Sequence, residues 1–178
     1  LRKKIENNIR NQYDLMSIEI SKKQLLDSLE KNHTLDLPEG ILKDEVNSIW
    51  ERVKNAKKNK TLDPDDRELK EQDLKKRYEK IAQRRVKLAL IVSNIANKNN
   101  VTIEEQEIAK GLAEYSKNYP GQEKQVFEYF KKNPSEIEVI RGPLFEKKVI
   151  EFVMNKAKKN IKKINVKEFN EIQKNAFK

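Results

Sequence analysis

The chain has 178 residues, of which 36% are hydrophobic and 38% are charged, and its formal net charge is +10. This length suits one domain of ordinary size or two small ones, and the charged share exceeds the roughly one quarter that is usual. Four glycines and five prolines are few for a turn-rich β protein. The absence of cysteine excludes disulfides and thiolate metal sites, and no apolar run approaches the roughly 18 residues of a membrane span.

The chain begins with Leu1 and carries no signal peptide, so we expect it to be a piece of a longer protein. Its positive charge leaves two interpretations open: a nucleic-acid partner, or a Lys- and Asn-rich composition spread over solvated helix faces. Acidic residues are interleaved with the basic ones almost everywhere, which favours the second. The densest basic stretch is KAKKNIKK, residues 156–163.

Apolar residues recur at three- and four-residue steps along the first half of the chain, which predicts long helices. The first covers residues 1–33 and the second residues 37–58. The third covers residues 64–99, with Asp63 as its N-cap and Pro64 in its first turn. The second half of this third helix is nearly apolar all round, so we expect that end to be buried and the other to project into water.

Shorter helices are predicted after residue 100. Thr102 and Glu105 have the spacing of a capping box, and they open a helix that reaches Tyr119. Gly111 lies inside this helix at a cost of roughly 1 kcal/mol relative to Ala. The pair at 120–121, Pro-Gly, marks a turn before the next short helix.

Three more helices complete an all-α fold, since no stretch shows the alternation of a β-strand. Pro134 opens one helix, and Gly142-Pro143 is expected to break it and start the next. A last short helix carries Val166, Phe169 and Ile172.

Few residues suggest catalysis or metal binding, and we expect no catalytic residue, no metal and no cofactor. The single histidine, His33, is interpreted as a partner of a helix C-terminus. The segment DPDD, residues 63–66, lacks the ligand spacing of an EF-hand loop and is interpreted as a helix cap. The basic segment RRVK, residues 84–87, either contacts phosphate or covers the flank of a half-buried helix, and the second is favoured.

Aromatic side chains gather around YPGQEKQVFEYF, residues 119–130. Two short helices cannot bury all of them against each other, so they either form a small core or face a cleft. Spacing alone favours a core, although tyrosine tolerates half-exposure because its ring is apolar and its tip polar. The residues concerned are Tyr115, Tyr119, Val126, Phe127, Tyr129 and Phe130.

Three segments, RRVKLALIVSNIA, YPGQEKQVFEYF and RGPLFEKKVIEFVMNKAK, resemble the C-terminal domain of bacterial trigger factors. Residues 1–45 are similar to the same family, so the resemblance covers essentially the whole chain in the family's order. It implies a single domain over residues 1–178, an elongated helical body with two protruding arms, related to the peptide-binding fold of SurA. The polar segment 54–77 departs from the family's pattern at the tip of the first arm. The stretch NKAKKNIKKIN stands where the family is usually more acidic.

The resemblance implies a cytoplasmic, ATP-independent chaperone module that binds unfolded or nascent polypeptides through weak, multivalent contacts. It places Tyr115, Tyr119, Val126 and Tyr129 on the surface that faces these polypeptides. Phe127 and Phe130 stay assigned to the core, as spacing favours. Prolyl isomerase activity and direct ribosome docking belong to family domains that this sequence lacks. No membrane partner is expected, and a weak homodimer is left open.

Two alternatives to the chaperone stay open at this point. One is a basic helical module that binds nucleic acid, although nucleic acid is the less favoured partner. The other is an interaction domain with one fixed partner. An enzyme is a distant third interpretation, because no catalytic grouping stands out.

Overall fold

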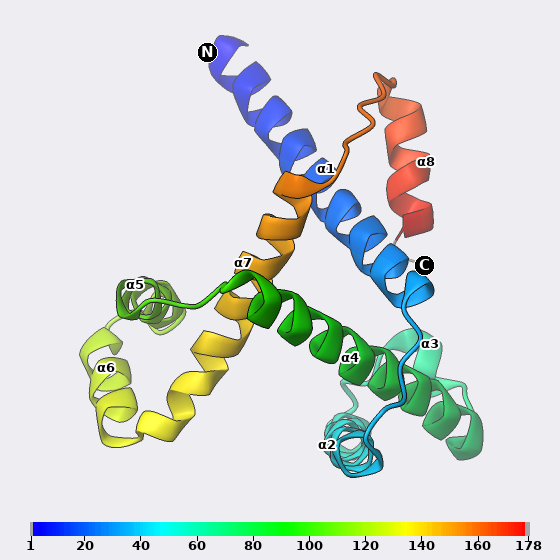
Figure 1. Ribbon diagram of the computed structural model, residues 1–178, viewed down its shortest axis with the longest axis vertical. Helices are drawn as coiled ribbons and strands as arrows, with labels where there is room; N and C mark the ends of the chain where they lie inside the picture. Colours follow the sequence, from blue (N-terminus) through cyan, green and yellow to red (C-terminus); the bar gives the residue numbers. More distant parts are fainter. Residues whose placement is uncertain (1, 177–178) are drawn as a thin grey trace. The chain divides into compact units, whose positions relative to one another are not determined.

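The computed structural model describes residues 2–176 and is helical throughout, without a strand in that range (Figure 1), which confirms the all-α class. The helices within it are α1 Arg2–Asn32, α2 Glu39–Lys58, α3 Pro64–Arg67, α4 Glu71–Asn99, α5 Glu105–Ser116, α6 Glu123–Lys132, the 3-10 helix η1 Pro134–Ile137, α7 Glu138–Lys156 and α8 Val166–Ala176.

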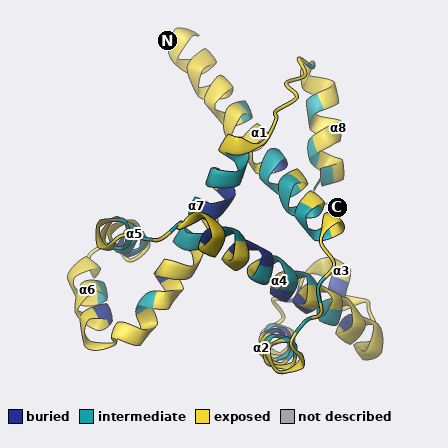
Figure 2. Ribbon diagram, viewed as in Figure 1, coloured by how far each residue is buried: buried dark blue, intermediate teal, exposed yellow. Residues whose placement is uncertain are grey.

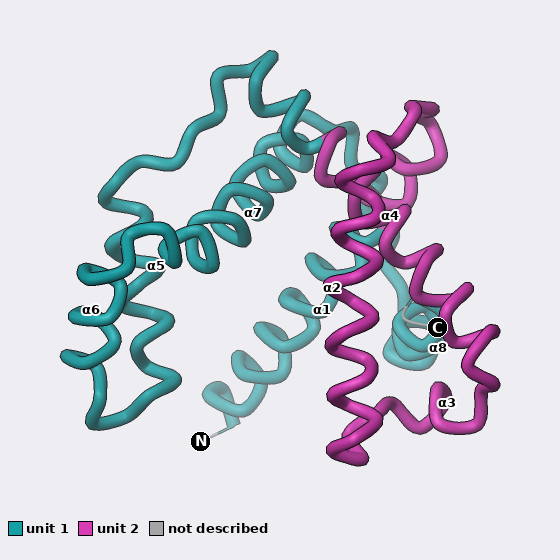
Figure 3. The backbone as a smooth tube through the Cα atoms, turned by 90° about the horizontal axis from the view of Figure 1, so that it is seen from below, with its two compact units in different colours: residues 1–23, 92–178 teal, residues 24–91 magenta. Residues whose placement is uncertain are grey.

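The chain divides into two compact units (Figure 3). Unit 1 comprises residues 1–23 and 92–178, and unit 2 comprises residues 24–91. Helices α1 and α4 therefore contribute residues to both units. The single domain over residues 1–178 and the two protruding arms depend on how the units are arranged, and they stay predictions.

Unit 2 buries an apolar core between α2, the α3 segment and α4. Its buried members are Ile49, Val53, Leu62, Leu74 and Ala82. Trp50 and Tyr78 pack against this core while remaining half-buried. Because unit 2 is small, its stability depends on these few side chains.

Ion pairs supplement this core on α4. Arg84 is paired with both Asp27 and Glu30 of α1, and Nη1 of Arg85 lies 2.7 Å from Oε1 of Glu45 on α2. The two arginines of the basic segment RRVK are therefore neutralised by acidic neighbours within unit 2. This favours its interpretation as a helix flank over a phosphate contact.

The prediction of one continuous helix over residues 64–99 is wrong, because the chain turns between α3 and α4. Asp63 does cap α3, and its Oδ1 accepts a hydrogen bond from the Asp65 amide at 3.1 Å. Asp66 is buried, accepts a hydrogen bond from the Tyr78 hydroxyl at 2.6 Å, and lies 3.0 Å from Nη1 of Arg77. Residues twelve apart in one helix are about 18 Å apart, so the contact with Tyr78 requires the turn.

Unit 1 is built around α7. Val92, Ala96 and Val149 form its buried cluster, against which Phe145 packs. Helix α8 contacts α1 through an edge-to-face pair of Tyr13 and Phe169, whose ring centroids are 5.2 Å apart. The small clusters of unit 1 leave much of its helical surface exposed (Figure 2).

Helix α5 packs directly on α7, and Gly111 is the residue that permits the approach. A Cβ atom at this position would lie 2.6 Å from Cδ1 of Leu144 and 3.0 Å from Cγ2 of Ile140. Glycine lowers the helix propensity of α5 at this position, but only a residue without a Cβ atom allows α5 to pack this closely on α7.

Two predicted helix boundaries in unit 1 are wrong. Helix α7 runs through Gly142-Pro143 without a break. Proline clashes with the Cβ of the preceding residue, and Gly142 has none, which removes one of the obstacles to proline inside a helix. The cap of α5 lies two residues later than predicted, because the amide of Glu104 donates to Oε2 of Glu107 at 2.9 Å.

We expect Gly111→Ala to lower the free energy of unfolding by about 1 kcal/mol, because overpacking against α7 outweighs the gain in helix propensity. The matched variant is Gly40→Ala in the first turn of α2, where nothing lies within 4 Å of an added Cβ. Gly40→Ala should raise the free energy of unfolding by about 0.5 kcal/mol. Urea unfolding followed by circular dichroism checks both, and stabilisation by Gly111→Ala would contradict the packing argument.

Alkaline pH should destabilise unit 2 through Tyr78. Burial, followed by its hydrogen bond to the Asp66 carboxylate, raises the pKa of Tyr78 from its ordinary value of 10.0 to about 12. Between these pH values only the unfolded state releases the proton, so stability present below pH 10 is lost as pH rises toward 12.

Tyr78→Phe should lower the free energy of unfolding at neutral pH by about 1 kcal/mol and should show a smaller alkaline loss. Tyr129→Phe, at a tyrosine that is 53% exposed, is the control and should retain the wild-type loss. Equal alkaline losses in all three proteins would rule out this role of Tyr78.

Candidate functional site

The candidate site begins at the turn between α5 and α6. The Gln122 amide donates to the Tyr119 carbonyl at 3.0 Å, with Pro120 and Gly121 between them. Gly121 has φ of +80°, which is the left-handed region that favours glycine at the third position of a type II turn. Because α5 ends at Ser116, Tyr119 lies in this turn and not in the helix as predicted.

Phe130 of α6 is the centre of an aromatic cluster that consists of Tyr115, Tyr119, Tyr129 and Phe130. Its ring meets Tyr115 edge-on at 5.7 Å and Tyr129 edge-on at 5.5 Å between centroids. The hydroxyl oxygens of Tyr115 and Tyr119 lie 3.2 Å apart, and this hydrogen bond raises the pKa of Tyr115. Aromatic pairs of this geometry stabilise beyond their buried area, so the cluster is held together while partly exposed.

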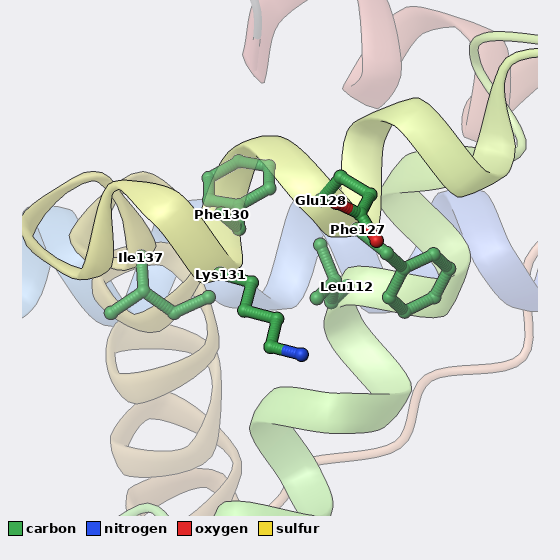
Figure 4. A pocket seen from close by; sticks show the side chains of 6 residues that line it. All are labelled: Leu112, Phe127, Glu128, Phe130, Lys131 and Ile137. Atoms are coloured by element: carbon green, nitrogen blue, oxygen red, sulfur yellow. The ribbon is translucent and has the colours of Figure 1, made fainter.

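Beside the aromatic cluster lies an open pocket of about 350 Å³, which we call the α6 pocket (Figure 4). Its walls come from α5, α6 and η1, and they are mostly apolar. The lining residues are Leu112, Phe127, Glu128, Phe130, Lys131 and Ile137. One glutamate and one lysine give the rim a balanced charge.

The structure brings three of the four predicted polypeptide-facing residues into the aromatic cluster. Tyr119 is 42% exposed and Tyr129 is 53% exposed, whereas Tyr115 and Val126 are half-buried. Val126 lies one turn before Phe130 on α6, hence on the same helix face. Their part in binding stays a prediction, because exposure alone assigns no partner.

The prediction of two core residues is half right. Phe130 is 7% exposed and belongs to the core, as predicted. Phe127 is 41% exposed and forms a wall of the α6 pocket, so its assignment to the core is wrong. Leu112 and Ile137 were missed as pocket residues, although Leu112 lies three residues before Tyr115 and therefore on the same face of α5.

Other features of the described chain do not suggest catalysis. Nδ1 of His33 lies 2.8 Å from the Leu29 carbonyl oxygen, so the ring donates to the end of α1, as predicted. Within residues 2–176, no group of three or more histidine, aspartate or glutamate side chains could hold a metal ion. None of the helices in that range combines the length and the apolar character that a membrane span needs.

The fold and the site define an all-α protein with an aromatic cluster and an open apolar pocket on its surface. The comparison with protein families identifies the group: residues 1–155 match the model of the bacterial trigger factor protein C-terminus. The chain belongs to this family. The match ends before the basic stretch at 156–163.

Curated relatives agree with the family assignment. The chain is 36% identical over 168 residues to the trigger factor of Rhodospirillum centenum, covering 94% of this chain and 38% of that protein. It is 37% identical to the trigger factors of Gluconacetobacter diazotrophicus, over 97% of this chain, and Granulibacter bethesdensis, over 96% of this chain. It spans only 39% and 38% of those two proteins, respectively. No solved structure matches the chain.

The two phenylalanines of α6 should respond differently to truncation. Phe130→Ala should lower the free energy of unfolding by about 3 kcal/mol, because it leaves a cavity beneath Tyr115 and Tyr129. Phe127→Ala should lower it by less than about 1 kcal/mol, because its ring is already partly exposed. Urea unfolding of both variants, followed by circular dichroism, measures the difference, and equal losses would contradict the burial described above.

Proposed function

We propose that these 178 residues act as an ATP-independent chaperone module that binds exposed apolar segments of unfolded or nascent polypeptides. The observation that carries the proposal is the pairing of the aromatic cluster with the α6 pocket, which leaves apolar rings accessible in a chain that is otherwise highly charged. Membership of the trigger factor C-terminus family supports the same activity.

The α6 pocket has the size for a short apolar group. A pocket of about 350 Å³ lies near the lower end of the range that holds small ligands, so one bulky side chain of a client fills it. The tyrosines beside it offer apolar rings with polar tips that remain hydrated when no client is bound. The site therefore suits side chains of an extended polypeptide better than a folded surface.

The expected affinity of one such contact is weak. Full burial of an apolar side chain contributes roughly 1.5 to 3 kcal/mol, and ordering the client offsets much of this gain. A single contact then corresponds to a dissociation constant on the order of micromolar or weaker. Several contacts along one client raise the overall affinity without slowing the release of each segment.

The proposed partners are unfolded and nascent polypeptides in the cytoplasm. The curated trigger factors are longer than this chain, which spans about 38% of the first of them. Ribosome docking and prolyl isomerase activity are not part of this proposal.

The four predicted polypeptide-facing residues provide the test. We expect the variant in which alanine replaces Tyr115, Tyr119, Val126 and Tyr129 together to suppress the aggregation of a chemically denatured client less well. About ten times more of this variant should be required for the same suppression. Light scattering after dilution of the client measures it. Unchanged suppression by a folded quadruple variant would remove these residues from the proposed site.

Two controls separate binding from folding. Alanine at Lys117, Asn118, Lys124 and Gln125, four exposed polar positions of the same segment, should leave suppression unchanged. Because Tyr115 also supports Phe130, a second variant changes only the two exposed rings, Tyr119→Ser and Tyr129→Ser. This milder variant should retain wild-type helicity and still lose part of the suppression.

A further inference from the structure

Two further open apolar pockets lie in unit 2, at the end of α2. One has a volume of about 360 Å³ and the other about 300 Å³, and Lys57 and Leu74 line both. Their apolar floor comes from α2, the α3 segment and the start of α4. It consists of Trp50, Val53, Leu62, Leu69 and Leu74. We call this pair the lysine-rimmed pockets.

The rim of these pockets is strongly cationic. Five cations, Lys54, Lys57, Lys58, Lys60 and Arg67, line the two pockets against two acidic residues, Glu71 and Asp66. Asp66 is only 3% exposed, and its carboxylate already contacts Arg77 and Tyr78. Its charge is therefore largely compensated within the fold.

The two adjacent lysines at the end of α2 are among the cations that are available to a partner. Lys54 is paired with Glu51 at 2.8 Å, whereas Lys57 and Lys58 have no ion-pair partner among residues 2–176. The negative end of the helix dipole stabilises their positive charge. The charge of Lys58 still reaches Glu51, whose pKa is lowered first by the hydrogen bond from Lys54 and then by the charges of Lys54 and Lys58.

The α6 pocket of unit 1 differs in this respect, because Glu128 and Lys131 balance each other on its rim. We infer that the lysine-rimmed pockets bind client segments in which an aromatic or aliphatic side chain lies next to Asp or Glu, whereas the α6 pocket binds neutral apolar segments. The inference rests on the proposed function and names a substrate class within it. The apolar floor buries the side chain, and Lys57 and Lys58 hold the adjacent carboxylates.

Charge complementarity gives selectivity more than strength at such a site. One exposed ion pair changes a binding constant by a few-fold, so two pairs change it by roughly threefold to tenfold. The same rim repels a segment that carries lysine beside its apolar residues. Salt weakens both effects, because the Debye length falls from about 10 Å at 0.1 M to about 3 Å at 1 M.

Trp50 makes the test specific to this site, since it is the single tryptophan of the chain and lines one of the two pockets. The probes are three tryptophan-free peptides that share Leu-Phe pairs and differ only in the residues between them: Asp-Asp, Asn-Asn or Lys-Lys. Titration followed by Trp50 emission should give the tightest binding for the Asp peptide, roughly threefold to tenfold above the Asn peptide, and the weakest for the Lys peptide. About 1 M salt should remove most of the difference.

The variant Lys57→Gln/Lys58→Gln should bind the Asp and Asn peptides equally. The matched control Lys3→Gln/Lys4→Gln changes two adjacent exposed lysines of α1 and should keep the wild-type preference. Equal binding of all three peptides, or equal loss in both variants, would overturn the inference. A shift in Trp50 emission that depends on protein concentration in the absence of peptide would also overturn the inference, because a second copy of the chain would then occupy the pockets.

The outcome separates this inference from the proposed function. Suppression of aggregation without discrimination among the peptides would leave the chaperone activity standing and remove the selectivity. Discrimination among the peptides without suppression of aggregation would support the selectivity of the pockets and remove the chaperone activity.

Discussion

The edge-to-face contacts of Phe130 with Tyr115 and Tyr129 are the interaction on which the surface of the α5–α6 segment depends. Helix α6 has only ten residues, too few to be stable in isolation, so its helicity comes from packing. One buried ring, Phe130, contributes to that packing. The cluster is therefore held together by ring contacts while Tyr119 and Tyr129 remain exposed.

Much of this architecture can be predicted from the sequence, because the apolar residues of amphipathic helices recur at three- and four-residue steps. The all-α class, the cap at Asp63 and the burial of Phe130 all follow from spacing. The turn at residues 68–70 could not be predicted, because Asp66 meets Tyr78 only in three dimensions. Phe127 was misplaced for the same reason: its exposure depends on how far η1 and α5 cover α6, which no local pattern records.

The lysine-rimmed pockets show another limit of predicting structure from the spacing of residues in the sequence. In the sequence, residues 54–60 belong to the polar segment 54–77, and their lysines fit the interpretation of a composition spread over solvated helix faces. The structure places them around an apolar floor to which α2, α3 and α4 all contribute. A run of charged residues indicates a binding site only when the fold places apolar side chains beside it. The two units thus offer apolar surfaces of similar size whose rims differ in charge.

Gly111 has an effect on the α6 pocket through its neighbour in the sequence. Leu112 forms a wall of that pocket, and the residue before it sets the distance between α5 and α7. A side chain at 111 would push α5 outward and carry Leu112 with it, which would widen the hollow without altering any residue that lines it. Under the proposed function, the size of client side chain that the pocket accepts would then depend on position 111, which faces α7 and does not line the pocket.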